Sequence, residues 1–87
     1  MIDAMPFLRL KFVDEHGMYK QLQHIRSEME EVEDAFQNPS TERLAEELAD
    51  LAQSCMTALY IIERTHGIHP LDVVVRNNEK NRVRGYI

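Results

Sequence analysis

Two apolar stripes at helical spacing constrain this chain more than any other feature of its sequence. In each stripe, apolar residues recur at steps of three and four, which predicts a helix with one buried face. Between the stripes stands "QNPS", where Pro39 disfavours helical geometry at Asn38 and Ser40 can cap the next helix, with Glu42 in its first turn. The sequence therefore predicts two long antiparallel helices joined by a short turn. The stripes are Met18, Leu22, Ile25, Met29, Val32 and Phe36, and then Leu44, Leu48, Leu51, Cys55, Leu59 and Ile62.

The segment before the first stripe supports two interpretations. Leu8, Leu10 and Phe12 alternate as in a strand, whereas Leu8 and Phe12 also share one face of a helix. We favour a short helix that begins at about Pro6 and is closed by Gly17, since glycine suits a C-terminal cap. The N-terminus is thus expected to add a short helix to an all-α fold.

The segment after the second stripe predicts another helix. The second long helix is expected to end near His66 with Gly67 as its cap, and Pro70 suits the first position of a helix over residues 70–81. The final six residues, "RVRGYI", are expected to form an extended tail. The predicted fold class is all-α, with an antiparallel core of two long helices and shorter helices at both ends.

At 87 residues the chain is expected to form one domain, residues 1–87. A monomer of this size buries only about 60 % of the surface that its unfolded chain exposes, so we expect a homodimer or homotetramer. Residues 58–62 are apolar on nearly every side of the predicted helix, which favours a subunit interface around Tyr60 and Ile61. The expected assembly is a multi-subunit helical bundle.

Charge and cysteine content limit the classes of partner. The net charge of −5 argues against binding to a nucleic-acid polymer. The single Cys55 lies in an apolar run, which indicates a small buried residue in a reducing compartment. There is no signal peptide pattern and no apolar run long enough to cross a membrane, so we expect a cytoplasmic protein.

Acidic residues concentrate in the middle of the chain and basic residues at its end. Residues 27–63 hold ten acids and one base, whereas residues 64–87 hold two acids and five bases. When the first long helix is shifted by nineteen residues onto the second, Glu28 falls on Glu47 and Glu31 on Asp50. Both pairs flank the same edge of their stripes, so a modest rotation of the helices can aim all four carboxylates into one space.

Two interpretations of these acids compete. Carboxylates three residues apart are common on solvated helix faces, but such faces usually carry Lys or Arg one turn later. Here Glu28 and Glu31 are followed at that spacing by Val32 and Ala35, so the repulsion is uncompensated. Four converging carboxylates suit Mg²⁺ or Mn²⁺, whereas zinc prefers His and Cys. We therefore interpret Glu28, Glu31, Glu47 and Asp50 as a metal site.

The motifs "SEMEEVEDA" and "LAEELADL", followed by "NEKNRVRGY", resemble the MazG-type all-α nucleoside triphosphate pyrophosphohydrolases over about residues 18–86. In that family an E-E-x-x-E helix and an E-x-x-D helix together hold magnesium. The resemblance implies that Glu28, Glu31, Glu47 and Asp50 are the magnesium-binding and catalytic residues. It differs at Ser27, where the family pattern opens with Glu.

The resemblance also implies a reaction and a substrate-binding tail. The expected activity is Mg²⁺-dependent hydrolysis of a nucleoside or deoxynucleoside triphosphate to the monophosphate and pyrophosphate, chemistry that needs metal ions and a positioned water. Lys80, Asn81 and Arg84 are expected to bind the substrate, with Arg82 adding charge. Two alternatives remain, a phosphoribosyl-ATP pyrophosphatase and an inactive helical oligomerisation or regulatory module. The base and sugar preference stays open.

Overall fold

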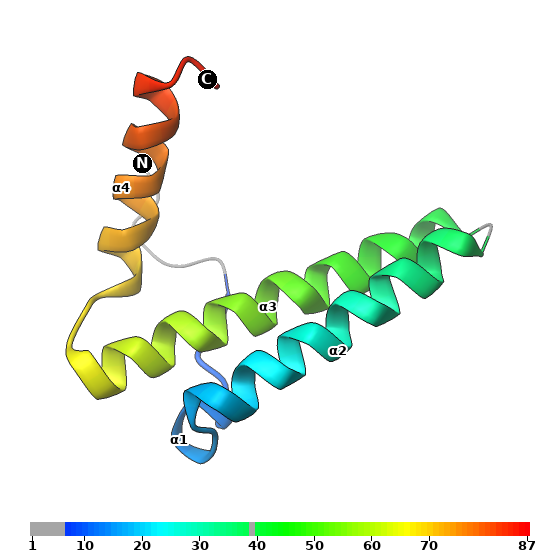
Figure 1. Ribbon diagram of the computed structural model, residues 1–87, viewed down its shortest axis with the longest axis horizontal. Coiled ribbons are helices and arrows are strands. Elements are labelled where there is room, and N and C mark those ends of the chain that lie inside the picture. The colour runs from blue at the N-terminus through cyan, green and yellow to red at the C-terminus, as the bar shows by residue number, and fades with distance from the viewer. Residues whose placement is uncertain (1–6, 39) are drawn as a thin grey trace.

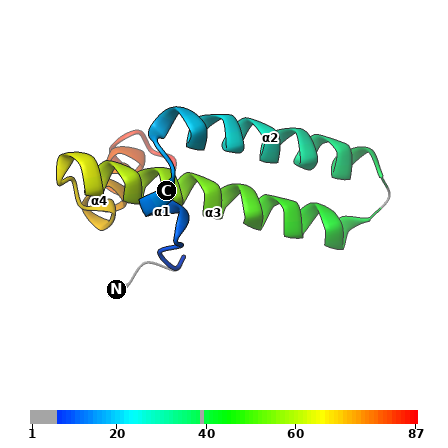
Figure 2. The ribbon, with the colours of Figure 1, turned by 90° about the horizontal axis from the view of Figure 1, so that it is seen from below.

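The computed structural model describes residues 7–38 and 40–87, and it confirms an all-α fold. Helices α2 and α3 lie side by side and antiparallel as a hairpin, α1 packs at one end of it, and α4 projects away from it (Figures 1 and 2). Within these described ranges, none of the helices has the length and apolarity needed to cross a membrane. The four helices are α1 (Phe12–Glu15), α2 (Met18–Gln37), α3 (Thr41–His66) and α4 (Pro70–Val83).

The ends of α3 follow the sequence signals. The Ser40 hydroxyl accepts a hydrogen bond from the Arg43 amide at 3.3 Å, and so satisfies one of the free amides at the start of the helix. At the other end Gly67 has φ 72°, the left-handed conformation that glycine adopts without steric cost. Asn38 is extended, as expected before a proline, although Pro39 itself lies outside the described residues.

Helix α4 begins where predicted but extends further than predicted. Pro70 is its first residue, and the His69 ring accepts a hydrogen bond from the Leu71 amide at 3.1 Å. The prediction of an extended tail from residue 82 is wrong, because α4 continues to Val83. It then closes with a Schellman motif centred on Gly85, whose φ is 77°. In this motif the Tyr86 amide donates to the Asn81 carbonyl at 2.9 Å and the Gly85 amide donates to the Arg82 carbonyl at 3.1 Å.

The N-terminal segment is a largely extended arm instead of the predicted helix. Residues 7–11 are not helical, α1 spans four residues, and the predicted start at Pro6 lies outside the described residues. Gly17 precedes α2 with φ −79°, so it does not close a helix in the left-handed conformation as predicted. The physical reason is that α3 side chains hold the arm by its carbonyl oxygens, which then make no helical hydrogen bonds. The Tyr60 hydroxyl donates to the Phe7 carbonyl, and Gln53 Nε2 donates to the Leu8 carbonyl, both at 3.2 Å.

The contact between α2 and α3, which we call the seam, buries only part of each predicted apolar stripe. On α2, Val32 and Ala35 are buried, whereas Leu22, Met29 and Phe36 are exposed. Leu48 and Cys55 of α3 are exposed too, so the prediction of a buried Cys55 is wrong. The stripes are wider than a two-helix seam can cover, and their outer edges face away from it.

Part of the interface predicted around Tyr60 and Ile61 is already covered within the chain. Ile61 is only 1 % exposed, and Tyr60 is half-buried and holds the arm through its hydroxyl group. The arm and α1 cover the face of α3 that the sequence analysis assigned to a second subunit. The interface between copies stays a prediction, and little of the Ile61 side chain is free to take part in it.

Candidate metal centre

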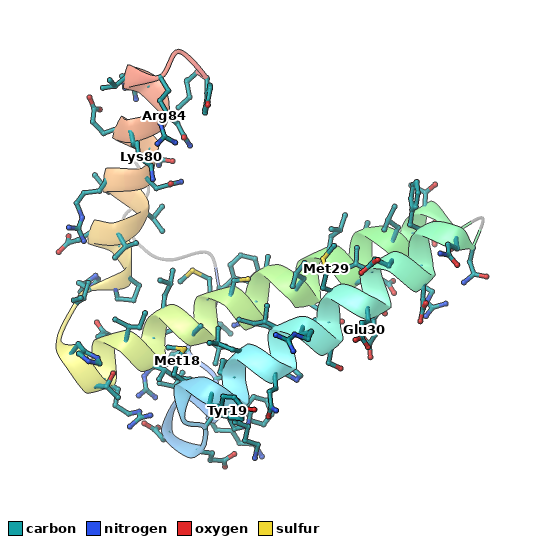
Figure 3. All side chains as sticks on the ribbon, in the orientation of Figure 1. Met18, Tyr19, Met29, Glu30, Lys80 and Arg84 are labelled. Atoms are coloured by element: carbon teal, nitrogen blue, oxygen red, sulfur yellow. The ribbon has the colours of Figure 1, made fainter. Side chains whose placement is uncertain are left out.

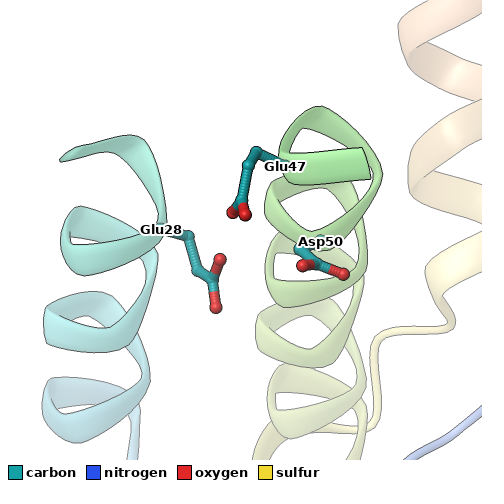
Figure 4. Close-up of side chains that lie close together, drawn as sticks. All are labelled: Glu28, Glu47 and Asp50. Carbon is teal, nitrogen blue, oxygen red and sulfur yellow. The ribbon is translucent and has the colours of Figure 1, made fainter. Parts of the chain in front are cut away.

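Three carboxylates meet across the α2–α3 seam. Glu28 projects from α2 towards Glu47 and Asp50, which lie three residues apart on α3 (Figure 4). One oxygen from each residue can be chosen so that all lie within 4.8 Å of one another. We call Glu28, Glu47 and Asp50 the acidic group. Their spacing on two neighbouring antiparallel helices is what brings them together, as the overlay of the two stripes predicted.

Two oxygens of the acidic group are hidden from solvent and unpaired. Among the residues that the structure describes, Glu28 Oε2 and Glu47 Oε2 find no hydrogen-bond partner, although nearly every buried polar atom in a folded protein has one. A buried carboxylate oxygen without a partner costs free energy unless a cation or a proton compensates it. Oxygen ligands converging from two helices have the chemistry that Mg²⁺ and Mn²⁺ bind, so the residues fit a hard divalent cation.

Burial and neighbouring carboxylates raise the pKa values of two of these acids, Glu28 and Glu47. Burial raises the pKa of Glu28 above its ordinary value of 4.5, and the nearby carboxylates of Glu31 and Asp50 raise it further. Burial also raises the pKa of Glu47, and the next largest influence is its interaction with Glu31. Each group therefore resists being charged while no cation is present.

Glu31 and His24 border the acidic group. Glu31 is exposed and is not one of the three residues whose oxygens converge, yet its charge reaches both Glu28 and Glu47. His24 Nε2 lies 3.2 Å from Glu28 Oε1, one helical turn earlier on α2. The structure thus brings three of the four predicted acids into one group and leaves the fourth at its edge.

A pocket of about 260 Å³ opens beside the acidic group, and we call it the side pocket. Glu28, Asp50 and His24 form its charged end. Its remaining walls come from the N-terminal arm, from α1, from the start of α2 and from the polar side of α3. These wall residues are Leu10, Phe12, Gln21, Gln53, Ser54 and Thr57.

A buried hydrogen-bond network fixes the wall of the side pocket that Gln21 forms. Gln21 is 1 % exposed, and its Nε2 donates to the Ser54 carbonyl on α3 at 2.9 Å. Its Oε1 lies 2.8 Å from His16 Nδ1, at the end of the arm. Arg64 completes the arrangement by donating to the Val13 and His16 carbonyls at 2.8 and 3.0 Å. These satisfied polar groups hold the arm, α2 and α3 in one position.

The structure does not bring the predicted substrate-binding residues to the acidic group. Lys80 and Arg84 are exposed on α4, which projects away from the part of α2 that holds Met29 and Glu30 (Figure 3). Arg82, the additional base, pairs with Glu79 on the same helix at 3.4 Å. Among the described residues, α4 packs against α3 and makes no contacts with α2. Lys80, Asn81 and Arg84 therefore do not line the side pocket of their own chain.

The sequence analysis missed the residues that shape the side pocket. Phe12 and Leu10 were treated only as members of an ambiguous apolar pattern, and Gln53 and Gln21 carry no motif of their own. The sequence did hold one signal. Gln21 and Gln53 are polar residues that border the two apolar stripes, so either residue could lie at the edge of a buried face. Only the rotation of the helices decides whether such residues are buried.

Comparison with known proteins agrees with this geometry. A model of the MazG nucleotide pyrophosphohydrolase domain matches residues 18–85, which is most of the chain and includes the acidic group and α4. Neither the curated proteins nor the solved structures contain a significant match to the chain. The arm and α1 lie before the matched region, whereas the carboxylates on α2 and α3 lie inside it. On the family match, and in agreement with its paired acidic helices, the chain belongs to the MazG nucleotide pyrophosphohydrolase family.

Proposed function

We propose that this protein is a Mg²⁺-dependent nucleoside triphosphate pyrophosphohydrolase, which converts a nucleoside or deoxynucleoside triphosphate to the monophosphate and pyrophosphate. The observation that carries the proposal is the pair of buried, unpartnered oxygens on Glu28 and Glu47, set on opposite helices of one acidic group. Membership of the MazG family supplies the class of reaction.

Glu28, Glu47 and Asp50 would hold Mg²⁺ directly, with Glu31 joining them from the exposed edge of the group. Mn²⁺ has the same preference for oxygen ligands and is expected to substitute. When bound, the metal neutralises charge on the phosphate oxygens and lowers the pKa of a bound water. The protein's own contribution is to hold these carboxylates in position, facing one another across the α2–α3 seam.

The reaction adds one water across a phosphoanhydride bond. The water oxygen bonds to phosphorus, the P–O bond on its far side breaks, and pyrophosphate separates from the monophosphate. A carboxylate must take the proton of the attacking water, and Glu31 suits this role since it is exposed beside the acidic group. Such transfer needs little covalent help from the protein beyond positioning and charge.

The nucleoside has a natural place in the side pocket, which adjoins Glu28 and Asp50. At about 260 Å³ the pocket is slightly smaller than most ligand sites, which run from about 300 to 1,000 Å³, so it suits the nucleoside part of a nucleotide. The Phe12 ring offers a face for stacking, and the Gln53 amide offers donors and an acceptor. Lys80, Asn81 and Arg84 are assigned to the phosphates, for which Arg is suited by its paired donors.

Pyrophosphate release from a panel of ribo- and deoxynucleoside triphosphates, with and without Mg²⁺, tests this function. We expect metal-dependent release by the wild type and none by Glu47→Gln, while Glu33→Gln on the exposed side of α2 keeps full activity. The substrate released fastest would also define the base and sugar preference.

Two outcomes would point to the alternatives. Silence across the panel, with a melting temperature that Mg²⁺ still raises, favours an untested nucleotide such as phosphoribosyl-ATP. Silence with no effect of Mg²⁺ on the melting temperature favours an inactive helical module, because a ligand that binds the native state must stabilise it.

A further inference from the structure

The two oxygens of the Glu28 carboxylate have different surroundings. Glu28 Oε1 lies 3.2 Å from His24 Nε2, one helical turn earlier on α2. Among the described residues, this is the only ion-pair contact that the acidic group makes. The second oxygen, Glu28 Oε2, is the buried atom that has no partner in that part of the chain. His24 therefore contacts one oxygen of the carboxylate and leaves the other for a cation.

The distance between His24 and Glu28 lies at the long end of the range for an N–H···O hydrogen bond. Contacts of this kind are often loose in an empty site and tighten when the site is filled. A carboxylate that binds a cation is ionised, so it can only accept a hydrogen bond, and His24 Nε2 would be the donor. The side chain that receives this bond projects towards Glu47 and Asp50 (Figure 4).

A neighbouring ring holds the His24 ring in place. The His16 and His24 ring centroids lie 6.5 Å apart at an interplanar angle of 71°, an edge-to-face arrangement that aromatic pairs favour. His16 is fixed in turn, because its Nδ1 lies 2.8 Å from Gln21 Oε1, while Gln21 Nε2 donates to the Ser54 carbonyl. The orientation of His24 is thus set by the network that also fixes the wall of the side pocket.

An ordinary surface ion pair is the other explanation of this contact. Exposed ion pairs contribute little to stability, and the His24 side chain is 46 % exposed. The Glu28 side chain, however, is only 14 % exposed, and both residues line the side pocket together with Asp50. Burial and Glu31 raise the pKa of Glu28, whereas His24 lowers it and so favours the ionised form that a cation needs.

We propose that His24 is a positioning residue of the metal site, which holds Glu28 Oε1 and so directs Glu28 Oε2 at the bound cation. Glutamate loses much rotational freedom when it is fixed, and a carboxylate that is already held loses less on binding. Hydrogen bonds to ligating groups orient them in this way at metal sites. This inference rests on the proposed function, because it requires a divalent cation at the acidic group.

Binding of Mn²⁺, followed through the electron paramagnetic resonance signal of the free ion, tests the proposal without catalysis. His24→Leu keeps an apolar side chain at this position and removes the donor, and it should raise the Kd for Mn²⁺ by about 10-fold or more. His24→Gln should return the Kd to near the wild-type value, because the Gln amide reaches about as far as His Nε2 and also donates.

The matched control is His66→Ala, which removes an exposed histidine from the far end of α3 and should leave the Kd unchanged. The melting temperature without metal should be nearly the same in all these proteins, since an exposed ion pair adds little stability. A wild-type Kd in His24→Leu, or an equal loss in His24→Leu and His24→Gln, would overturn the proposal.

Two further readouts separate positioning from other roles. Electron spin echo measurements on bound Mn²⁺ should show no directly coordinated imidazole nitrogen, and such a nitrogen would make His24 a ligand instead. Saturating Mn²⁺ should restore pyrophosphate release by His24→Leu, whereas release that stays low would assign His24 to the reaction itself. Wild type that binds no Mn²⁺ would instead overturn the proposed function, because the acidic group would then hold no metal.

Discussion

The α2–α3 hairpin and α4 differ in what holds them in place. The hairpin is closed by a short turn, buries Val32 and Ala35 in its seam and concentrates acids, whereas α4 is basic and touches only the end of α3. The positions of the carboxylates are therefore fixed by contacts within one chain. The positions of the bases depend on what packs against α4. The acidic group is held more firmly than the bases that we propose to act with it.

The largest expected effect falls on the hairpin. Asp50→Asn should lower pyrophosphate release by at least about 100-fold, because it removes a charged ligand from the acidic group. The helices should stay folded, and the melting temperature without metal should not fall, because the change also relieves repulsion within the acidic group. Release assays paired with thermal melts by circular dichroism measure both. An Asp50→Asn protein that keeps full activity would contradict the site assignment, and Glu33→Gln serves as the matched acid elsewhere on the hairpin.

The next effect falls on α4 and separates substrate binding from metal binding. Arg84→Ala should lower kcat/KM by about 30-fold, since a hydrogen bond to a charged group contributes about 2 kcal/mol. The rise in melting temperature caused by Mg²⁺ should not change, because α4 holds no metal ligand. Arg76→Ala, on the same helix, is the control. An equal loss in both variants would mean that α4 acts only through its overall charge.

The sequence predicted the α2–α3 hairpin better than it predicted the position of α4. Glu28, Glu47 and Asp50 could be assigned because two neighbouring helices joined by a short turn leave few ways to arrange their faces. The seam could not be placed, because a stripe that includes Leu22 and Met29 as well as Val32 is compatible with several rotations. The direction of α4 depends on the backbone conformation at Gly67, and no pattern within the helix reveals it.

A smaller effect is expected from Phe12, which lies at the start of α1 in the wall of the side pocket. Phe12→Ala should raise KM by about tenfold and leave kcat nearly unchanged, because stacking of a base on an aromatic ring contributes about 1–3 kcal/mol. Steady-state kinetics on the preferred triphosphate measure this split, with Tyr19→Ala as the control for an exposed aromatic outside the side pocket. An unchanged KM would place the base outside the side pocket.

The smallest effect concerns pH. Since the pKa values of Glu28 and Glu47 are raised in the folded state, the contribution of these two groups to the stability of the metal-free protein should be greatest below their ordinary value of 4.5 and be lost as pH rises through the folded values. Bound Mg²⁺ should remove this loss by compensating the ionised carboxylates. Melting temperatures across this pH range, with EDTA and with Mg²⁺, should diverge by a few degrees. Parallel curves would contradict the assignment of these two groups.

The hydrogen bonds between α3 and the N-terminal segment have a consequence for which substitutions this protein can accept. Gln53 and Tyr60 of α3 donate to main-chain carbonyls of the arm, and Arg64 donates to the main-chain carbonyls of Val13 in α1 and of His16 after it. Leu10 and Phe12 can therefore be replaced without loss of these bonds, while the path of the arm is preserved. A lineage, or a protein engineer, could thus alter nucleotide preference at the arm and leave the acidic helices untouched.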